Sequence, residues 1–381
     1  MSGSDFSFGT RASGSRGHHS AVIDDVDMES VHSSLTSAPS VYSYNSSRDG
    51  TTLLRFVQGR AFNAQNDLYF FPADEEEFTR LEKNDLKHLV AIGRLYVEQE
   101  KVQRILAPSP PLPKQILDLG TGTAGWAMAM AQEFPHAEVI GIDLAPNTSR
   151  FPLPPNCRLE IDDFNLGLPH YYNSCDLVHS RAVANGVQDF KWYINEAAKC
   201  LKPGGMLLMT EGNHNLLNAA KEHQECAFGE GGPGQSWFAR ALFEGHNTLK
   251  RRGSSVDARV LLENLMIECP LLTDVGAHTR LMPVGPWDRG STPEEDQQKR
   301  ILGILTRQTS IDLIGAMEPL YVSAGYSAAD VKQMVDGTKN ELNQLTEHMY
   351  MKWKYAYGTR NTVPIPTDDE CEPEKSFQER H

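Results

Sequence analysis

The chain lacks long hydrophobic runs and paired cysteines, and each absence argues against a class of protein. No segment reaches the roughly 18 consecutive apolar residues that a membrane-spanning helix needs, so we expect no membrane span. The opening residues contain no apolar signal core, so we expect no secretion. The 6 cysteines are scattered without metal-type spacing. We therefore expect reduced thiols, no metal site, and a cytoplasmic or nuclear protein.

Basic residues are also scarce. The chain has 36 Lys and Arg against 50 Asp and Glu, which gives a net charge of −14. Such a field repels a phosphate backbone unless a local basic face opposes it. The compact basic cluster Lys250-Arg251-Arg252 is more typical of the solvated end of a helix. We therefore expect neither nucleic acid nor a membrane as a partner.

Low-complexity segments flank a chain that otherwise has enough hydrophobic residues, 40%, to build a core. Residues 1–50 are rich in serine and have few periodic apolar positions, and residues 362–381 are similar. Such segments bury too little surface to offset the entropy of ordering them. We expect both ends to be disordered.

A glycine-rich loop follows a predicted buried strand within residues 116–126. The strand ends near Asp118, turns through glycines and opens a helix, so that a ligand can lie against bare backbone. The spacing of Gly120, Gly122 and Gly125 also fits a dinucleotide fingerprint, so a nicotinamide-dependent oxidoreductase is one interpretation. Asp118 argues against it, because a carboxylate repels a pyrophosphate and suits an ammonium or sulfonium group.

More strands of this kind follow in order. Strands are predicted at 139–143, 158–164, 175–181 and 206–211. Asp143 ends the first of them, where an acid can accept both hydroxyls of a ribose. A helix is predicted from Asp189 to Leu201, and the following Lys-Pro-Gly-Gly is a typical helix stop.

Further motifs extend the pattern over most of the chain. They are Ser43-Tyr44, Asn66-Asp67, Arg80-Leu81-Glu82, Gly93-Arg94-Leu95-Tyr96, Pro155-Asn156-Cys157, Glu160-Ile161-Asp162-Asp163, His179-x-Arg181, Pro283-Val284-Gly285-Pro286-Trp287 and His348-x-Tyr350. The ordered strands resemble the class I S-adenosylmethionine-dependent methyltransferases, and the whole set resembles their LaeA-like members in filamentous fungi. The resemblance implies an α/β fold with a Rossmann-like seven-stranded sheet, helical cap and lid insertions, and S-adenosylmethionine as cofactor.

The resemblance also divides the ordered part of the chain. It implies a helical cap over 51–110, a cofactor-binding core over 111–215, and a substrate lid with the rest of the sheet over 216–361. Within these regions the residue pattern predicts helices at 74–106, 293–317 and 328–348, strands at 271–275, 279–284 and 350–357, and a hinge-like loop at 229–234. The strand at 350–357 would be the antiparallel last strand of the sheet.

For the glycine loop, the resemblance implies contacts with the cofactor. Asp118, Gly120, Thr121 and Gly122 would bind it, with Asp118 and the glycines facing its methionine part. Asp143 would hold the ribose hydroxyls.

For the next two strands, the resemblance implies contacts with the adenine and the reacting methyl group. Asp163 would take the adenine amino group beside the Phe164 backbone, and Asp162 is an equal candidate by register. Ser180 and Arg181 would border the methyl-transfer cleft.

One departure from the family pattern lies in the loop. The family usually has glycine at the position of Ala124 and an aliphatic residue after it, whereas this chain has Ala124-Gly125. We expect the cofactor to fit, because alanine is small.

Methyl transfer requires alignment of the reactants more than covalent chemistry by the protein. A hydroxyl acceptor would need a general base. The candidates are His179, Glu211 and His214, at or beyond the carboxyl ends of two predicted strands, where open α/β sheets bind ligands. The Asn-Pro-Pro-Tyr loop of base and amide N-methyltransferases is absent after Val178, which argues against methylation of nucleic-acid amines.

Three functions therefore stay open. We predict transfer of a methyl group to a small-molecule acceptor, in fungal secondary metabolite biosynthesis. The alternative is a LaeA-like nuclear regulator of secondary metabolism that acts through protein partners, which the serine-rich first segment suits. A nicotinamide-dependent oxidoreductase is the third and weakest interpretation.

Overall fold

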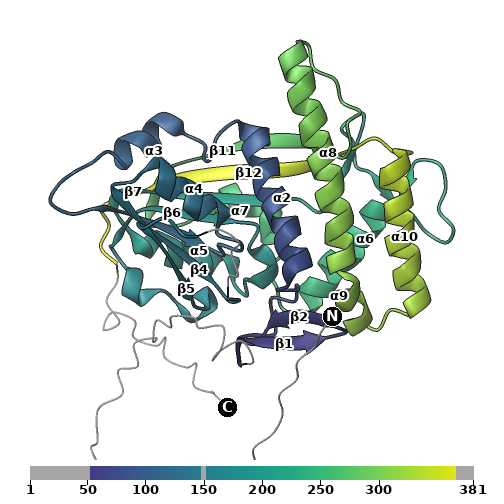
Figure 1. Ribbon diagram of the computed structural model, residues 1–381, viewed down its shortest axis with the longest axis horizontal. Helices are drawn as coiled ribbons and strands as arrows, with labels where there is room; N and C mark the ends of the chain where they lie inside the picture. The colour runs from purple at the N-terminus through teal and green to yellow at the C-terminus, as the bar shows by residue number, and fades with distance from the viewer. Residues whose placement is uncertain (1–51, 147–151, 366–381) are drawn as a thin grey trace, which may run out of the picture. The chain divides into compact units, whose positions relative to one another are not determined.

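The computed structural model of the protein describes residues 52–146 and 152–365 (Figure 1). The expected disorder of residues 1–50 lies outside the described residues, as do Ser43-Tyr44 and nearly all of the expected disordered segment at 362–381.

A mixed sheet with the order β11-β12-β7-β6-β3-β4-β5 forms the core, and β8 pairs with β12 beside this path. Its strands are β3 (Lys114–Leu119), β4 (Ala137–Asp143), β5 (Cys157–Ile161), β6 (Cys175–Arg181), β7 (Leu201–Gly212), β8 (Leu217–Asn218), β11 (Leu272–Pro283) and β12 (Met349–Arg360). Strands β3 to β7 are parallel to one another, whereas β12 is antiparallel to both β7 and β11. This confirms the predicted Rossmann-like methyltransferase sheet, with β8 as an added strand.

The chain order reverses at β3, which has β4 on one side and β6 on the other. Crossover connections leave β3 and β6 in opposite directions there, so a crevice forms at their carboxyl ends, where doubly wound sheets bind ligands. This topology places the glycine loop and the ends of β4, β6 and β7 around one site.

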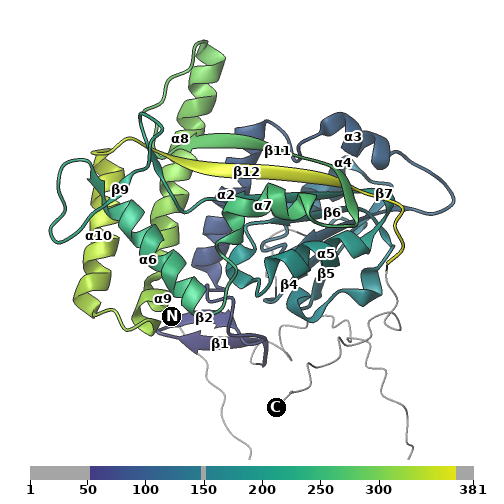
Figure 2. The same cartoon turned by 180° about the vertical axis from the view of Figure 1, so that it is seen from behind.

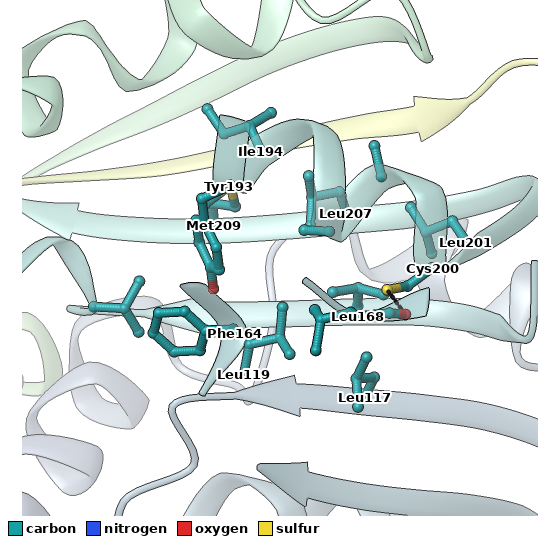
Figure 3. Close-up of a cluster of buried hydrophobic side chains, with 14 of the residues drawn as sticks. Leu117, Leu119, Phe164, Leu168, Tyr193, Ile194, Cys200, Leu201, Leu207 and Met209 are labelled. Atoms are coloured by element: carbon teal, nitrogen blue, oxygen red, sulfur yellow. Dashed lines mark hydrogen bonds between the residues drawn. The ribbon is translucent and has the colours of Figure 1, made fainter. Parts of the chain in front are cut away.

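Successive side chains along each strand point to opposite faces of the sheet, so the sheet has two apolar faces for the helices to cover. One face packs against α5 (Phe190–Cys200) and α7 (Ala258–Ile267), and the other against α3 (Gln99–Ile105) and α4 (Gly125–Glu133). Figure 3 shows part of the first face, with labelled side chains from β3, β7 and α5: Leu117, Leu119, Leu207, Met209, Tyr193 and Ile194.

Several predicted elements differ in extent from those observed. The helical region at 74–106 is two helices, because Gly93 takes a left-handed φ of 72° and ends α2 (Glu75–Ile92) before α3 begins. The strand segments at 271–275 and 279–284 form one strand, β11, with an irregularity between Thr273 and Gly276. The Lys-Pro-Gly-Gly segment lies in the first part of β7, one residue after α5 ends.

A second group of elements lies beyond the sheet edge, beside α2 (Figures 1 and 2). It comprises β1 (Leu54–Val57), β2 (Arg60–Asn63), β9 (Glu225–Cys226), β10 (Gln235–Ser236), α6 (Trp237–Arg251), α8 (Pro293–Ala316), α9 (Glu318–Ser323) and α10 (Ala328–Gln344). Helix α2 packs on α8, and α6 packs on α10, around a separate apolar cluster. In chain order, α6 is inserted between β7 and α7, and α8 to α10 between β11 and β12; their role as a substrate lid stays a prediction. The region boundaries at 51–110, 111–215 and 216–361 stay predictions.

Within the described part of the chain, no helix has both the length and the apolar character needed to cross a bilayer.

Candidate cofactor and acceptor site

A cavity lies at the carboxyl ends of β3, β4, β6 and β7, under residues of α2, α6 and α8. Most of the predicted site residues line it, namely Asp118, Gly120, Thr121, Gly122, Asp143, Phe164, His179, Arg181, Glu211 and His214. The structure therefore brings together residues that are far apart in the sequence; Asp85 of α2 and Arg181 of β6, 96 positions apart, form an ion pair at the cavity wall. Asp162, Asp163 and Ser180 are not among the lining residues.

The glycine loop is held open by its own backbone. The N–H groups of Gly120 and Thr121 both donate to the Ile142 carbonyl at 2.9 Å, which ties the loop to the neighbouring strand β4. Gly120 has a φ of 74°, and a Cβ there would lie 2.6 Å from Cγ1 of Val183. Glycine is therefore required for both conformation and space.

Asp143 lies where the glycine loop meets the end of β4. Its carboxylate accepts the Gly122 N–H at 2.8 Å and the Ala145 N–H at 3.2 Å. Burial raises the pKa of this carboxyl, and the backbone donors partly oppose that rise. The acid is thus oriented at the cavity wall with acceptor capacity left for a ligand.

Asp118 and His179 form a buried pair on adjacent strands. Oδ1 of Asp118 is 2.7 Å from Nδ1 of His179, and Oδ2 accepts the Thr121 hydroxyl at 2.8 Å. The His179 ring also stacks on Trp126 with centroids 3.8 Å apart. Burial lowers the pKa of His179. The ring is therefore held as a neutral partner of Asp118, with its orientation fixed by two neighbours.

The Ala124-Gly125 order has a structural explanation. Ala124 has a left-handed φ of 61° at the start of α4, a conformation that glycine adopts more easily. A Cβ at Gly125 would lie 2.4 Å from Oδ2 of Asp85, so an aliphatic residue there would displace that carboxylate. Asp85, from α2, instead reaches the cavity and pairs with Arg181. Sequence reasoning missed Asp85, although it lies on the same helix face as the lining residues Leu81 and Asn84.

The three predicted residues outside the lining are engaged elsewhere. Asp163 accepts the Asn66 amide at 2.6 Å and the Asn165 N–H at 3.0 Å, where it caps the short helix η1 (Phe164–Leu166). Asp162 lies 3.4 Å from the ring of His170.

Ser180 lies on the opposite face of β6 from His179 and Arg181, because successive side chains alternate along a strand. Its hydroxyl is 2.8 Å from that of Tyr193 in α5. Ser180 is therefore part of the packing between the sheet and α5.

Glu211 is the second-last residue of β7, lies on the cap side of the cavity and is 3% exposed. It accepts the N–H groups of Val183 at 2.8 Å and Ala184 at 3.1 Å, and Arg259 lies 3.7 Å away. Burial raises the pKa of Glu211 to about 7, with Arg259 opposing the rise. A carboxyl of this kind exchanges a proton near neutral pH.

Two stacked histidines lie beyond Glu211. The rings of His214 and His246 are 3.6 Å apart, and His246 is 2.8 Å from Asp257. Burial lowers the pKa of His214 to about 4, so its ring is neutral at pH 7. Nδ1 of each ring is buried without a hydrogen-bond partner among the described residues. Sequence reasoning found His214 but missed His246, which comes from α6.

Lys87 and Trp353 complete the cap side. Lys87 of α2 is 2% exposed and its ammonium lies 4.5 Å from the centroid of the Trp353 ring, in β12. Burial lowers the pKa of Lys87 well below its ordinary value, and the nearby Arg80 and Arg181 act in the same direction. The sequence could not indicate this contact, because Lys87 lies in α2, early in the chain, and Trp353 lies in β12, the last strand.

The loop at 229–234, predicted as a hinge over the site, contributes no residue to the cavity lining. Its Gly229 carbonyl accepts the side-chain amide of Gln333 in α10 at 2.9 Å. Its role as a gate stays a prediction.

Comparison with known proteins gives matches over the same regions. Among solved structures, phosphoethanolamine N-methyltransferase 2 of Haemonchus contortus is 16% identical, with 79% of this chain and 62% of that chain covered and a TM-score of 0.39. The secondary metabolism regulator laeA of Coprinopsis cinerea is 29% identical over 84% of this chain and 76% of that protein. Methyltransferase pytC of Aspergillus terreus is 26% identical over 83% of this chain and 87% of that protein.

Residues 113–251, which hold the glycine loop and the ends of β4, β6 and β7, match the family model described as a methyltransferase domain. The relatives extend this match over most of the chain. With the sheet order and the glycine loop described above, these matches support a class I S-adenosylmethionine-dependent methyltransferase that is similar to the LaeA-like proteins.

Proposed function

We propose that the sheet side of the cavity binds S-adenosylmethionine and that the cap side holds a small-molecule methyl acceptor of fungal secondary metabolism. The observation that carries the proposal is the position of Asp143, a buried carboxylate oriented by the N–H of Gly122 beside the glycine loop. The names of the relatives, a secondary metabolism regulator and fungal methyltransferases, support the metabolic context.

The residues present fit this cofactor. Gly120 and Gly122 leave bare backbone at the cavity wall, and a Cβ at Gly122 would already meet Leu81 at 3.3 Å. In our assignment Asp143 accepts the ribose hydroxyls, and Asp118 with the loop of Gly120 to Gly122 faces the methionine ammonium. A carboxylate next to a cationic ligand is favourable at short range.

For the adenine end we propose Phe164, because it lines the cavity. Asp163 is bound to Asn66 and Asn165 in this arrangement, and Asp162 lies next to His170. Both acids therefore have partners within the protein. Arg181, held by Asp85, would border the transferred methyl group.

The bound cofactor supplies a methyl group on a sulfonium, which is a good leaving group. The protein then has to align the acceptor, exclude water, and take a proton if the acceptor is a hydroxyl. Glu211 is our candidate for the proton, because its carboxyl titrates near neutral pH at the cavity wall. His214 is the second candidate, whereas His179 is occupied by Asp118 and Trp126.

Calorimetric titration tests the cofactor assignment. Protein freed of ligand by dialysis is titrated with S-adenosylhomocysteine and, separately, with NADH. We expect micromolar binding of S-adenosylhomocysteine and none of NADH. Binding of NADH alone would overturn the proposal in favour of an oxidoreductase.

The relationship to a secondary metabolism regulator favours a second candidate function, in which the chain acts through protein partners. Untargeted metabolite and transcript profiles of a deletion strain separate the two. Loss of one methylated product indicates an enzyme of one pathway, whereas broad transcript changes indicate a regulator. Complementation with the Glu211→Gln variant then shows whether methyl transfer is needed in either case.

A further inference from the structure

A second cavity, of about 390 Å³, lies between α2, α4 and the face of the sheet that α4 covers. Its volume falls within the range of roughly 300–1,000 Å³ that is typical of small-molecule sites. Arg181, Thr210 and Tyr355 form part of its floor, since they are register partners on β6, β7 and β12 and their side chains point to the same face. The proposed methyl transfer does not use this space.

Helix α2 covers this second cavity with one stripe of side chains. Glu82, Asp85, Leu86 and Leu89 recur at helical spacing and line it together. Leu86 and Leu89 are 48% and 39% exposed, so they leave apolar surface in water that a ligand could cover. The other walls are largely apolar and include Ile92, Leu95, Val97, Trp126, Met128 and Leu208.

The ionisable groups of the inner wall are paired or neutral. Arg181 pairs with Asp85, and Nδ1 of His88 lies 2.7 Å from the hydroxyl of Tyr355. Burial lowers the pKa of both His88 and His179, so both rings are neutral at pH 7. The inner wall therefore has no charge that requires a counter-charge from a ligand.

The other charged residues in the described lining are Glu82 and Arg94. Arg94 is exposed and donates a hydrogen bond to Gln99, and Glu82 is partly exposed. Water therefore solvates both charges without help from a ligand. A charged ligand would lose its own hydration in this cavity and gain no counter-charge in return, which is unfavourable. The lining thus favours a molecule without net charge.

The Asp85–Arg181 ion pair lies between the second cavity and the cofactor cavity, because both residues line both spaces. The Ala124-Gly125 order makes this position possible. A Cβ at Gly125 would lie 2.4 Å from Oδ2 of Asp85, so a larger residue there would displace the carboxylate. The departure from the family pattern at this point therefore leaves room for the wall that separates the two spaces.

We propose that the second cavity binds an apolar, uncharged small molecule, at a site that the Asp85–Arg181 ion pair separates from the cofactor cavity. The inference goes beyond the proposed function and does not depend on it. An apolar molecule covers Leu86 and Leu89 and leaves the ion pair intact, and apolar cavities of sufficient size bind such molecules. Both cavities can then be occupied at the same time.

The test observes methionine methyl groups by NMR, because methionines mark each cavity. Met128 lines the second cavity, whereas Met317 and Met351 line the cofactor cavity. The full chain carries ¹³C at its methionine methyl groups, and the three resonances are assigned by single substitutions to leucine. Titrations are run without and then with S-adenosylhomocysteine, so that the result without it does not depend on the cofactor assignment.

The probes have one apolar body with three different end groups. The flexible set is octan-1-ol, octanoate and octylammonium, and the planar set is 2-naphthalenemethanol, 2-naphthoate and 2-naphthylmethylammonium. We expect at least one alcohol to shift the Met128 resonance at a concentration that leaves Met317 and Met351 unshifted. It should bind about tenfold more tightly than the anion and the cation with the same body, because neither ion regains its lost hydration.

A pair of variants on α4 locates the site. Ala129→Leu fills part of the second cavity and should weaken binding of the alcohol about tenfold or more. Gln132→Leu is the matched control, because it adds the same side chain at an exposed position of α4 that lines neither cavity. It should leave the affinity unchanged.

A second pair of variants tests the ion pair as the wall. Asp85→Asn removes the counter-charge of Arg181, so the preference for the alcohol over the carboxylate should narrow or reverse. Asp312→Asn is the control, because Asp312 pairs with Lys83 and lines neither cavity. It should keep the order of affinities.

Three results would overturn the inference. The first is that no probe shifts Met128, or that the alcohols shift only Met317 and Met351. The second is that an ion binds the wild-type protein as tightly as the alcohol with the same body. The third is that Ala129→Leu and Gln132→Leu have equal affinities for the alcohol. Failure to bind S-adenosylhomocysteine would instead count against the proposed function alone.

Discussion

The two sides of the cavity differ in how their polar groups are satisfied. On the sheet side, Asp118 and Asp143 each have two partners within the protein, and those partners come from the same loop and strands. On the cap side, the buried polar nitrogens of Trp353, His214 and His246 have no partner among the described residues. The sheet side is thus preorganised before any ligand binds, whereas these buried cap-side nitrogens are left without internal partners.

The two sides also differ in their origin along the chain. The sheet side comes from strand ends between Asp118 and Arg181, whereas the cap side combines the end of β7 with α2, α6, α8 and β12. Cofactor binding should therefore depend on local sequence, and acceptor binding on packing of the inserted helices.

The largest expected effect is a loss of kcat without a loss of cofactor affinity. Glu211→Gln should lower kcat by about 10²–10⁴-fold, the usual contribution of a general base, and leave the affinity for S-adenosylhomocysteine unchanged. Steady-state kinetics and calorimetry on the same sample measure both. If kcat is undiminished, Glu211 is not the general base, and His214→Asn is the next variant to test.

The same residue should make stability depend on pH. The carboxyl of Glu211 has a pKa of about 7 in the folded protein, against an ordinary value of 4.5. Above pH 4.5 the unfolded chain ionises while the folded protein stays neutral, so this residue favours unfolding increasingly up to pH 7. Relative to Glu211→Gln, wild-type stability should fall by about 3 kcal/mol across that window.

Denaturant unfolding of both proteins at pH 5 and pH 8 measures this difference without cofactor. Comparing the change between the two pH values removes any constant effect of the substitution. Parallel stability curves for the two proteins would show that Glu211 has an ordinary pKa.

On the sheet side, Asp143→Ala should weaken binding of S-adenosylhomocysteine by on the order of 1–3 kcal/mol, because the Gly122 N–H and the ligand hydroxyls lose their acceptor. Asp162→Ala is the matched control at the end of the next strand, outside the cavity lining. Calorimetry should show no change for it. Equal affinities for all three proteins would mean that the ribose contact is misplaced.

The smallest expected effect concerns the backbone of the glycine loop. Ala124→Gly should stabilise the protein by roughly 0.5 kcal/mol, because relief of the left-handed conformation exceeds the added entropy of the unfolded chain. Ala127→Gly, within the right-handed part of α4, should instead destabilise it by about 1 kcal/mol. Thermal unfolding shows whether each variant is more or less stable than the wild type. A loss of stability in both variants would contradict a strained Ala124.

Prediction from sequence succeeded where the signal is local. The end of β4 at Asp143, the extent of β6 from Cys175 to Arg181, and the start of α5 after Asp189 all follow from short patterns of apolar runs and caps. Most of the residues predicted for the cofactor line the cavity, and their roles stay predictions. Ser180 shows the limit of such reasoning, since its side chain points to the other face of β6 from His179 and Arg181 and contacts Tyr193.

The sequence by itself determined the individual strands and the glycine loop, because strand period and turn chemistry act over a few residues. The order of the strands in the sheet followed only from the resemblance to the class I methyltransferases. Only the tertiary structure decided the cap side, because the contacts of Lys87 with Trp353 and of His214 with His246 join segments that no local pattern relates. It also decided the charge states there, since burial shifts the pKa of Lys87 and Glu211 and burial is a property of the packed fold.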